Sequence, residues 1–153
     1  MSQPKPITEG QLKFMKPMIG AWGRFNTWIY DLSGGRVLGK FLGSEICIVT
    51  MTGAKTGKKR DIPLMYIPYK DGVLLVASLG GAPRHPTWYH NVVANPDVDV
   101  RVKDRTMQLR ARRATPAEKV QLWEVCTKYY PPYDEYQART ERDIPVFICE
   151  PRD

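Results

Sequence analysis

Three observations predict a mainly β (α+β) domain built on an antiparallel barrel with flanking helices. The chain has 153 residues, enough for one domain with a sizeable core. Its 13 prolines and 12 glycines indicate many turns, which disfavours a helical bundle. From residue 45 onward, about six short strand-like runs follow one another in hairpin order, and that order favours antiparallel pairing.

The expected strands are recognised by β-branched residues and by alternation of apolar and polar residues. They are 45–51, 61–69, 72–78, 97–102, 105–114 and 144–150. Asp71-Gly72 is a strong turn signal between the second and the third. In the fourth, Val98, Val100 and Val102 alternate with charged residues, which predicts one buried and one solvated face.

Two helices are expected to interrupt the strands. The first covers 86–94 and ends before an Asn-Pro pair. The second begins after Thr115, a good N-cap, with Pro116 at its first position and Glu118 completing a capping box. It is expected to run to about Tyr130, where two prolines stop it.

Residues 1–43 form a basic, amphipathic N-terminal arm ahead of the barrel domain at 44–153. The arm holds six Lys or Arg against Glu9 and Asp31. Its apolar residues recur at spacings of three and four, as on a helix with one apolar face. Such a helix packs on the domain core or lies in a membrane interface with Trp and Phe on its apolar side. The sequence leaves both readings open.

Composition limits the classes of partner. The net charge of +7 and the pI near 9.4 favour anionic partners. No apolar run is long enough to span a membrane, and no secretory signal is evident. Cys47, Cys126 and Cys149 are far apart in sequence and show no zinc-ligand spacing, so they are expected to be buried thiols in a reducing cytoplasm, and no metal site is expected.

The densest charge lies in the loop 53–60, which holds four cations and no acid in eight residues. Its two glycines let backbone amides approach an anion closely, while Lys and Arg supply charge and forked hydrogen bonds. The glycine spacing is not that of a Walker A loop. The loop therefore predicts either phosphate binding or a solvated hairpin turn.

A second candidate segment runs from Ser78 through Gly80-Gly81 into the helix that carries Trp88 and Asn91 on one face. Exposed amides at 78–81 can hydrogen-bond the polar edge of a flat ring, and the helix N-terminus adds partial positive charge. The alternative is an ordinary loop with a core tryptophan.

A third segment, 129–136, places four tyrosines around a double proline. It forms either a rigid aromatic wall for a planar ligand or a structural cluster that caps the barrel. The sequence shows no nucleophile elbow, no Cys-His pair and no metal-ligating motif. A phosphate loop, a ring platform and an aromatic wall without acid–base residues indicate an enzyme whose cofactor supplies the chemistry.

Taken together, these segments resemble the F420-dependent (deazaflavin-dependent) nitroreductase and quinone reductase family of mycobacteria and related actinobacteria. The segments that carry the resemblance are NTW at 26–28, TGxKTGxxR at 52–60 with PL at 63–64, ASxGGA at 77–82, PxWYxNxxANP at 86–96, YPxYxxYQ at 130–137, and IP at 144–145 with CEP at 149–151. Each alone is a weak signal, but they occur in order across nearly the whole chain.

The resemblance implies a split β-barrel of the flavin-reductase-like type, with 44–153 as the F420-binding domain. The implied cofactor is coenzyme F420, an 8-hydroxy-5-deazaflavin with a phosphodiester and a polyglutamate tail. The implied cofactor-binding residues are Ala54, Lys55, Thr56, Arg60, Asp61, Ile62, Val76, Ala77, Ser78, Leu79, Thr87, Trp88, Tyr89, His90, Asn91 and Tyr133. The implied catalytic residues, on the substrate side, are Ser78, Tyr130, Tyr133 and Tyr136.

The implied reaction is hydride transfer from reduced F420 to a quinone-like or nitroaromatic acceptor. A menaquinone-like acceptor would give the arm a purpose: contact with an acidic membrane by an otherwise cytoplasmic protein. Met65 stands where nitroreductase-type members carry Tyr, and Met cannot donate a hydrogen bond. Three alternatives remain: an F420 carrier or sequestering protein with little turnover, an FMN enzyme on the same fold, and a module that binds nucleic acid or acidic membrane. Nucleic acid is not expected, because basic and aromatic residues do not interleave on one strand face.

Overall fold

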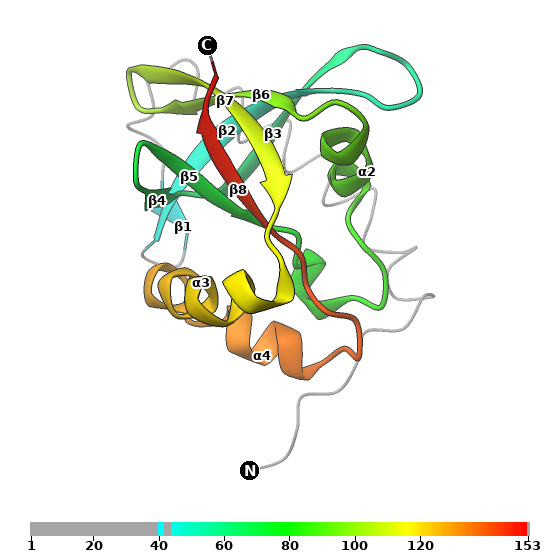
Figure 1. Ribbon diagram of the computed structural model, residues 1–153, viewed down its shortest axis with the longest axis vertical. Helices are drawn as coiled ribbons and strands as arrows, with labels where there is room; N and C mark the ends of the chain where they lie inside the picture. The colour runs from blue at the N-terminus through cyan, green and yellow to red at the C-terminus, as the bar shows by residue number, and fades with distance from the viewer. Residues whose placement is uncertain (1–39, 42–43, 153) are drawn as a thin grey trace.

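An eight-stranded antiparallel sheet carries the fold in residues 40–41 and 44–152, which the computed structural model describes (Figure 1). The strands are β1 (Lys40–Phe41), β2 (Ser44–Thr52), β3 (Lys59–Met65), β4 (Ile67–Tyr69), β5 (Gly72–Val76), β6 (Asp97–Val102), β7 (Arg105–Arg113) and β8 (Val146–Pro151). The helices are the 3-10 turn η1 (Leu79–Gly81), α2 (Thr87–Ala94), α3 (Pro116–Tyr129) and α4 (Tyr133–Ala138).

The sheet closes into a barrel because the run 59–69 pairs with a different strand at each end. Its first part, β3, pairs with β2, and its last part, β4, pairs with β5. The order β2-β6-β7-β8-β5 completes the ring. Between β3 and β4, Tyr66 donates its N–H to the carbonyl of Glu45 at 2.9 Å. With β3 and β4 counted as one, the ring has the six antiparallel strands that the sequence predicts.

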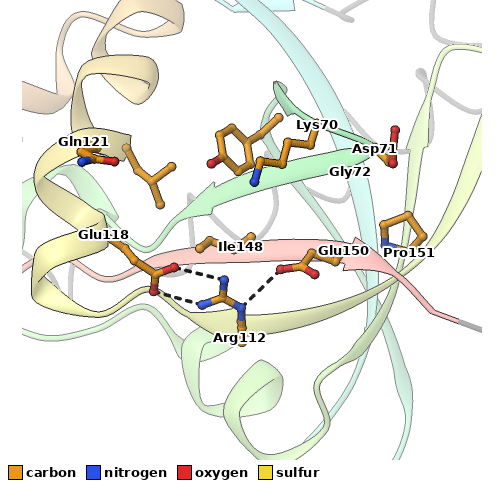
Figure 2. Close-up of a pocket in the computed structure, with 11 residues that line it drawn as sticks. Lys70, Asp71, Gly72, Arg112, Glu118, Gln121, Ile148, Glu150 and Pro151 are labelled. Carbon is orange, nitrogen blue, oxygen red and sulfur yellow. Dashed lines mark hydrogen bonds and ion pairs between the residues drawn. The ribbon is translucent and has the colours of Figure 1, made fainter.

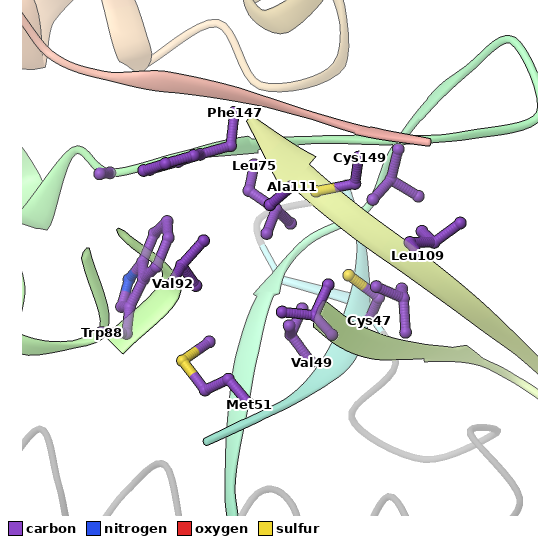
Figure 3. Close-up of a cluster of buried hydrophobic side chains, with 14 of the residues drawn as sticks. Cys47, Val49, Met51, Leu75, Trp88, Val92, Leu109, Ala111, Phe147 and Cys149 are labelled. Atoms are coloured by element: carbon purple, nitrogen blue, oxygen red, sulfur yellow. The ribbon is translucent and has the colours of Figure 1, made fainter. Parts of the chain in front are cut away.

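The barrel interior is filled by every second residue of its strands (Figure 3). Alternation along β6 is complete, with Val98, Val100 and Val102 buried between more exposed charged residues. The buried members of this interior cluster are Cys47, Val49, Met51, Val73, Leu75, Ala77, Trp88, Val92, Val98, Val100, Val102, Leu109, Ala111, Phe147 and Cys149.

Two strands, β5 and β8, are buried on both faces. One face of each strand points into the barrel. The opposite face packs against α3 and α4, which lie below the barrel in Figure 1. This explains why both strands are continuous apolar runs in the sequence. The outer cluster comprises Ile67, Leu74, Val76, Leu122, Cys126, Tyr130, Tyr133, Ile144, Val146 and Ile148.

The start of α3 confirms the predicted capping box. The Thr115 hydroxyl accepts from the N–H of Glu118 at 3.2 Å, and the Glu118 carboxylate accepts from the N–H of Thr115 at 2.9 Å. Pro116 occupies the first helical position. Each of the four N-terminal amides of a helix lacks an intrahelical partner, so these bonds fix where α3 begins.

Two local expectations differ from the structure. The expected strand 61–69 is divided into β3 and β4, because the run must change pairing partner to close the ring. The tyrosine segment contains a short helix, α4, where the sequence suggested only a stiff path. Pro132 adopts helical angles ahead of α4, and Asp134 and Glu135 complement its N-terminal partial charge.

The predicted N-terminal arm, 1–43, lies almost wholly outside the described residues; Lys40–Phe41 pairs with the start of β2. No helix in 40–41 or 44–152 has the length and apolar character to cross a membrane. The three cysteines are buried and unpaired, as predicted. Burial raises the pKa of the Cys47 and Cys126 thiols to about 12, so both stay protonated.

Candidate functional site

The basic loop, Gly53–Lys58, is a closed turn between β2 and β3. The N–H of Gly53 donates to the carbonyl of Lys58 at 2.8 Å, and the N–H of Gly57 donates to the carbonyl of Gly53 at 3.0 Å. Gly57 has φ +68°, a conformation that glycine adopts without steric cost. The Thr56 hydroxyl accepts from the N–H of Lys58 at 3.2 Å and so stiffens the tip.

The cations of this region differ from Arg112 of β7 in having no carboxylate partner among residues 44–152. Within 44–152, no carboxylate lies in ion-pair distance of Lys55, Lys58 or Arg60, and all three are exposed. By contrast, Arg112 pairs with Glu118 at 3.0 Å, and this bond holds the pKa of the Glu118 carboxyl at about 2. Charge that protein carboxylates do not neutralise attracts an anionic ligand.

Asn91 joins the basic loop to α2. Its side-chain oxygen accepts from the N–H of Ala54 at 2.9 Å. One turn later, the side-chain amide of Asn95 donates to the carbonyl of Thr52 at 3.3 Å. The sequence placed Asn91 in the cofactor site because of its motif. The structure shows that it also sets the position of the loop, so the predicted residues 54–62 and 87–91 form one connected surface.

The segment after β5 connects that surface to the tyrosines. Ala77 is buried inside the barrel, whereas Ser78 and Leu79 are half-buried at its rim. A Cβ on Gly81 would lie 2.5 Å from the carbonyl oxygen of Tyr136, so η1 and α4 approach too closely there for any other residue. The structure thus brings the predicted ring platform and the aromatic segment together.

The three predicted catalytic tyrosines are not equivalent. Tyr130 and Tyr133 are 3% and 4% exposed, whereas Tyr136 is half-buried. The hydroxyls of Tyr130 and Tyr136 lie 3.0 Å apart, and the ring of Tyr133 packs edge-on against Tyr130. Burial, joined for Tyr130 by the Tyr136 hydrogen bond, raises the pKa of both Tyr130 and Tyr133. The hydroxyls of Tyr130 and Tyr133 therefore keep their protons at neutral pH.

The other predicted cofactor residues divide by burial. Val76, Ala77 and Trp88 belong to the core, and the ring of Trp88 packs on Phe147 at 5.8 Å. These three can offer a ligand backbone atoms or a ring edge. The exposed or half-buried members are Ala54, Lys55, Thr56, Arg60, Asp61, Ile62, Ser78, Leu79, Thr87, Tyr89, His90 and Asn91.

His85 lies at the start of this surface and had no partner that the sequence could identify. Its ring stacks on Tyr89 at 4.1 Å, and Tyr89 accepts a hydrogen bond from Arg113 at 3.0 Å. Partial burial and then the charge of Arg142 lower the pKa of His85. His85 therefore favours its neutral form, and its Nδ1 lies 2.9 Å from Nη1 of Arg142.

Sequence reasoning missed Arg142 and Arg139. Arg142 donates to the carbonyls of Ala77, Ser78 and Ala82, and Arg139 donates to the carbonyl of Gly80 at 3.3 Å. Both lie between α4 and β8, about sixty residues after the segment they hold. No local pattern could have identified them.

Two hollows are lined by none of the predicted site residues. One, of about 240 Å³, lies between α3 and the ends of β5 and β8, and its Arg112 is already paired with Glu118 and Glu150 (Figure 2). The other, of about 470 Å³, adjoins the base of the basic loop and includes Lys59 and Arg152. No cluster of metal-ligating side chains occurs within the described ranges.

Comparison with known proteins gives a consistent picture. A family model described as F420H(2)-dependent quinone reductase matches residues 22–151. An F420H(2)-dependent quinone reductase of Mycobacterium tuberculosis is 36% identical over 133 residues, which cover 84% of this chain and 89% of that protein.

Solved structures agree. The structure of an F420-H2 dependent reductase, FDR-A, superposes with a TM-score of 0.64 at 48% identity, covering 69% of this chain and 93% of its own. A second, described as a domain-swapped dimer, superposes with a TM-score of 0.67 at 42% identity, covering 81% and 98%. The similarity confirms the predicted flavin-reductase-like barrel.

Proposed function

Because this chain belongs to the F420H(2)-dependent quinone reductase family, we propose that it is an oxidoreductase that reduces a quinone-like acceptor with F420H2. The observation that carries the proposal is the set of unneutralised cations at the basic loop, which Asn91 fixes beside α2. F420 carries its phosphodiester and glutamates at one end and a flat ring at the other. The structure offers matching charge and a matching rim along one connected surface.

The residues fit the cofactor in two parts. Lys55 lies in the exposed basic loop and Arg60 at the exposed start of β3, where charge-assisted hydrogen bonds to a phosphodiester cost little desolvation. The backbone at 77–79 and the α2 residues 87–91 form the rim for the ring. When bound, reduced F420 supplies the hydride for the reaction. The protein's part is to hold the ring and the acceptor in register and to exclude water.

The substrate side is proposed to be Ser78 and Tyr136, supported by Tyr130 and Tyr133. Tyr136 is the half-buried tyrosine of the three, so its hydroxyl can face an acceptor without movement of the core. Its contact with Tyr130 at 3.0 Å orients it. Reduction of a quinone carbonyl develops negative charge on oxygen, and a protonated hydroxyl placed there stabilises that charge.

Met65, at the end of β3, supports a quinone rather than a nitroaromatic as the acceptor. Met65 packs against the outer apolar cluster and offers no hydrogen-bond donor where nitroreductase-type members carry tyrosine. An apolar thioether suits the hydrocarbon face of a quinone better than a nitro group. We therefore propose quinones as the better substrates and nitroaromatics as poor ones.

We further propose that the arm 1–43 brings the enzyme from the cytoplasm to an acidic membrane where a menaquinone-like acceptor resides. The support is its sequence: Lys and Arg on one side and Trp and Phe on the other. Removing residues 1–20 should reduce sedimentation with anionic liposomes and leave F420 affinity within about twofold. Unchanged sedimentation would refute this part alone.

The test of the main proposal has two steps. Purified protein is titrated with F420, and F420H2 oxidation is then followed after addition of menadione. We expect saturable binding and turnover, with Tyr136→Phe and Ser78→Ala each lowering kcat at least tenfold. Tyr69→Phe, at the hollow between α3 and the ends of β5 and β8, is the matched control. It should leave F420 binding and kcat unchanged.

The outcomes separate the alternatives. Binding without turnover on several quinones would support a carrier with little turnover. No binding would refute F420 as the cofactor. If the purified protein is yellow and shows flavin fluorescence, FMN would instead be supported as the cofactor.

A further inference from the structure

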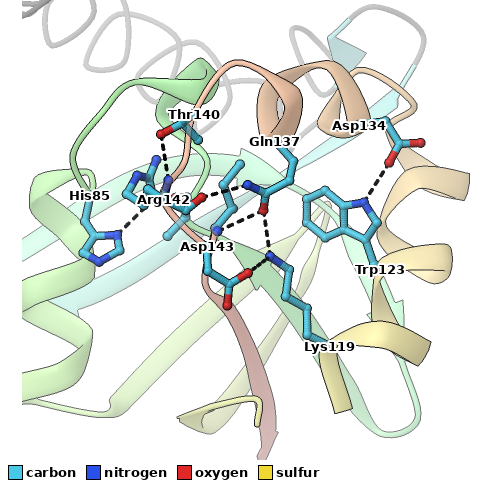
Figure 4. A network of polar contacts seen from close by, with 10 residues as sticks. His85, Lys119, Trp123, Asp134, Gln137, Thr140, Arg142 and Asp143 are labelled. Atoms are coloured by element: carbon cyan, nitrogen blue, oxygen red, sulfur yellow. Dashed lines mark hydrogen bonds and ion pairs between the residues drawn. The ribbon is translucent and has the colours of Figure 1, made fainter. Parts of the chain in front are cut away.

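One guanidinium group organises the segment at the rim of the candidate site. Arg142 donates through Nε to the carbonyl of Ala82 at 3.1 Å and through Nη1 to the carbonyl of Ala77 at 3.0 Å. Nη2 donates to the carbonyl of Ser78 at 2.8 Å, and Nη1 also lies 2.9 Å from Nδ1 of His85 (Figure 4). Four acceptors within nine residues converge on one side chain.

These bonds determine where the amides of the segment point. In a trans peptide the C=O and the following N–H point in opposite directions, and no cis bond occurs in the described chain. The carbonyls of Ala77 and Ser78 are turned toward Arg142. The N–H groups of Ser78 and Leu79 are therefore turned away from it. A guanidinium at the carbonyl end also polarises these peptides and strengthens their amides as donors.

Two backbone bonds lie within the segment, from the N–H of Gly81 to the carbonyl of Ser78 at 2.9 Å and from that of Ala82 to Leu79 at 3.1 Å, but its conformation is strained. Leu79 has φ +45°, and Gly80 and Gly81 follow at +63° and +83°. A non-glycine residue in the left-handed region is strained and needs support from its surroundings. Arg142, with Arg139 on the carbonyl of Gly80, provides that support from a part of the chain 59 to 65 positions away.

Arg142 is itself held in place. Its N–H donates to the Thr140 hydroxyl at 3.1 Å, and its carbonyl accepts from the side chain of Gln137 at 2.7 Å (Figure 4). Gln137 also accepts from Lys119 of α3 and from the N–H of Ile144. Through these bonds the guanidinium fork of Arg142 is connected to α3, to α4 and to the start of β8, which are rigid elements.

His85 gains a defined tautomer from the same fork. Arg142 can only donate, so Nδ1 of His85 accepts and Nε2 carries the proton. The stacked ring of Tyr89 fixes the plane of His85. The fork therefore also sets which donor His85 presents at the rim.

We propose that Arg142 is the positioning residue of the cofactor rim: it turns the amides of Ser78 and Leu79, and Nε2–H of His85, toward the deazaflavin ring. This inference rests on the proposed function. Arg142 acts through the backbone and need not touch cofactor or substrate. It lies outside the basic loop, so its loss leaves the anion-binding cations unchanged.

The test compares Arg142→Met and Arg142→Lys with Arg152→Met. Arg152 is the matched control because it also donates to two backbone carbonyls, those of Val98 and Leu109, and pairs with Asp99 away from the rim. The readouts are Tm, the Kd of oxidised F420 from fluorescence quenching well below Tm, and kcat and KM with menadione.

We expect both Arg142 variants to raise the Kd of F420 and the KM of F420H2 by about tenfold or more, because lysine keeps the charge but loses the fork. Arg152→Met should lower Tm comparably and leave the Kd within about twofold. A merely structural Arg142 would lower Tm alone.

A folded Arg142→Lys protein with the Kd and KM of the wild type would overturn the inference. If Arg142→Met does not fold, Arg142→Lys alone provides the test. Chemical rescue sharpens the result: added methylguanidinium should restore F420 binding to Arg142→Ala and not affect Arg152→Ala. Wild-type protein that fails to bind F420 would instead refute the proposed function, which keeps the two failures distinct.

Discussion

The two loops at the candidate site are held in opposite ways. The basic loop closes on itself through Gly53 and Lys58 and takes one bond from Asn91. The rim segment 77–85 has two backbone bonds of its own, within 78–82, and is also held by Arg142 and Arg139 from beyond α4. One loop is exposed and rich in cations, and the other is half-buried and has Arg84 as its one charged residue.

The difference shows how each loop tolerates change. A self-contained turn can lose a side chain and keep its shape, so substitutions there should affect ligand binding and leave stability nearly unchanged. A segment held from outside transmits packing changes, so substitutions there should affect stability and binding together. The following variants test this contrast.

The largest expected effect comes from adding one methyl group to each loop. Gly81 has φ +83°, and a Cβ there would meet the Tyr136 carbonyl at 2.5 Å, whereas Gly57 has φ +68° with open space around it. Gly81→Ala should lower the free energy of unfolding by about 3 kcal/mol or more, and Gly57→Ala by about 1 kcal/mol. Urea denaturation measures both. Equal losses would mean that packing against α4 does not distinguish the loops.

Next in size is the loss of loop charge. Replacing Lys55 and Arg60 together by Ala should raise the Kd of F420 about 100-fold, since each charge-assisted bond contributes about 1.5 kcal/mol or more. Tm should stay nearly constant, because both side chains are exposed and make no described ion pair. Arg105→Ala, at the exposed β6–β7 turn, is the control. A Kd within threefold of wild type would rule out the loop as the phosphodiester site.

The same contrast explains what could be read from the sequence. The strands, the capping box at Thr115 and the basic loop can each be recognised from residues close together in the sequence. The signals are the alternation in Val98–Val102, an N-cap three residues before Glu118, and four cations around two glycines in 53–60. Each follows from local chemistry, and the structure confirms the strands and the capping box.

What the sequence could not show are relations between distant residues. Arg142 looks like any surface arginine in the sequence, and only the fold places it behind the rim. Likewise, the tyrosines at 130–136 are equally aromatic in the sequence, but packing against α3 buries Tyr130 and Tyr133 and leaves Tyr136 half-exposed. The helix α4 was missed because the two prolines before it suggested a stop.

A smaller effect is expected at the bond that joins the basic loop to α2. Asn91→Ala removes the acceptor for the N–H of Ala54 and should raise the Kd of F420 by about threefold to tenfold, with a stability loss near 1 kcal/mol. Asn91→Asp keeps an acceptor but adds negative charge beside the cations. It should restore Tm and still weaken F420 binding. If Asn91→Asp has both the Tm and the Kd of the wild type, the hydrogen bond to Ala54 matters for F420 binding and the added negative charge does not.

The smallest effect is a pH dependence at the rim, where His85 faces Arg142, Arg113 of β7 and His90 of α2. Partial burial, then the two arginine charges and that of His90, lower the pKa of His85 below its ordinary value near 6.5. The unfolded chain therefore binds this proton more readily than the folded one, so stability is retained above about pH 6.5 and falls as pH drops below it. The loss should stay below about 1 kcal/mol, because the ring is partly exposed and solvent screens the charges.

His85→Asn keeps an oxygen that accepts from Arg142 and cannot titrate, so its urea midpoint should fall less than that of wild type between pH 7.5 and pH 5. Parallel curves for the two proteins would show that the fork holds the rim without help from the neutral histidine.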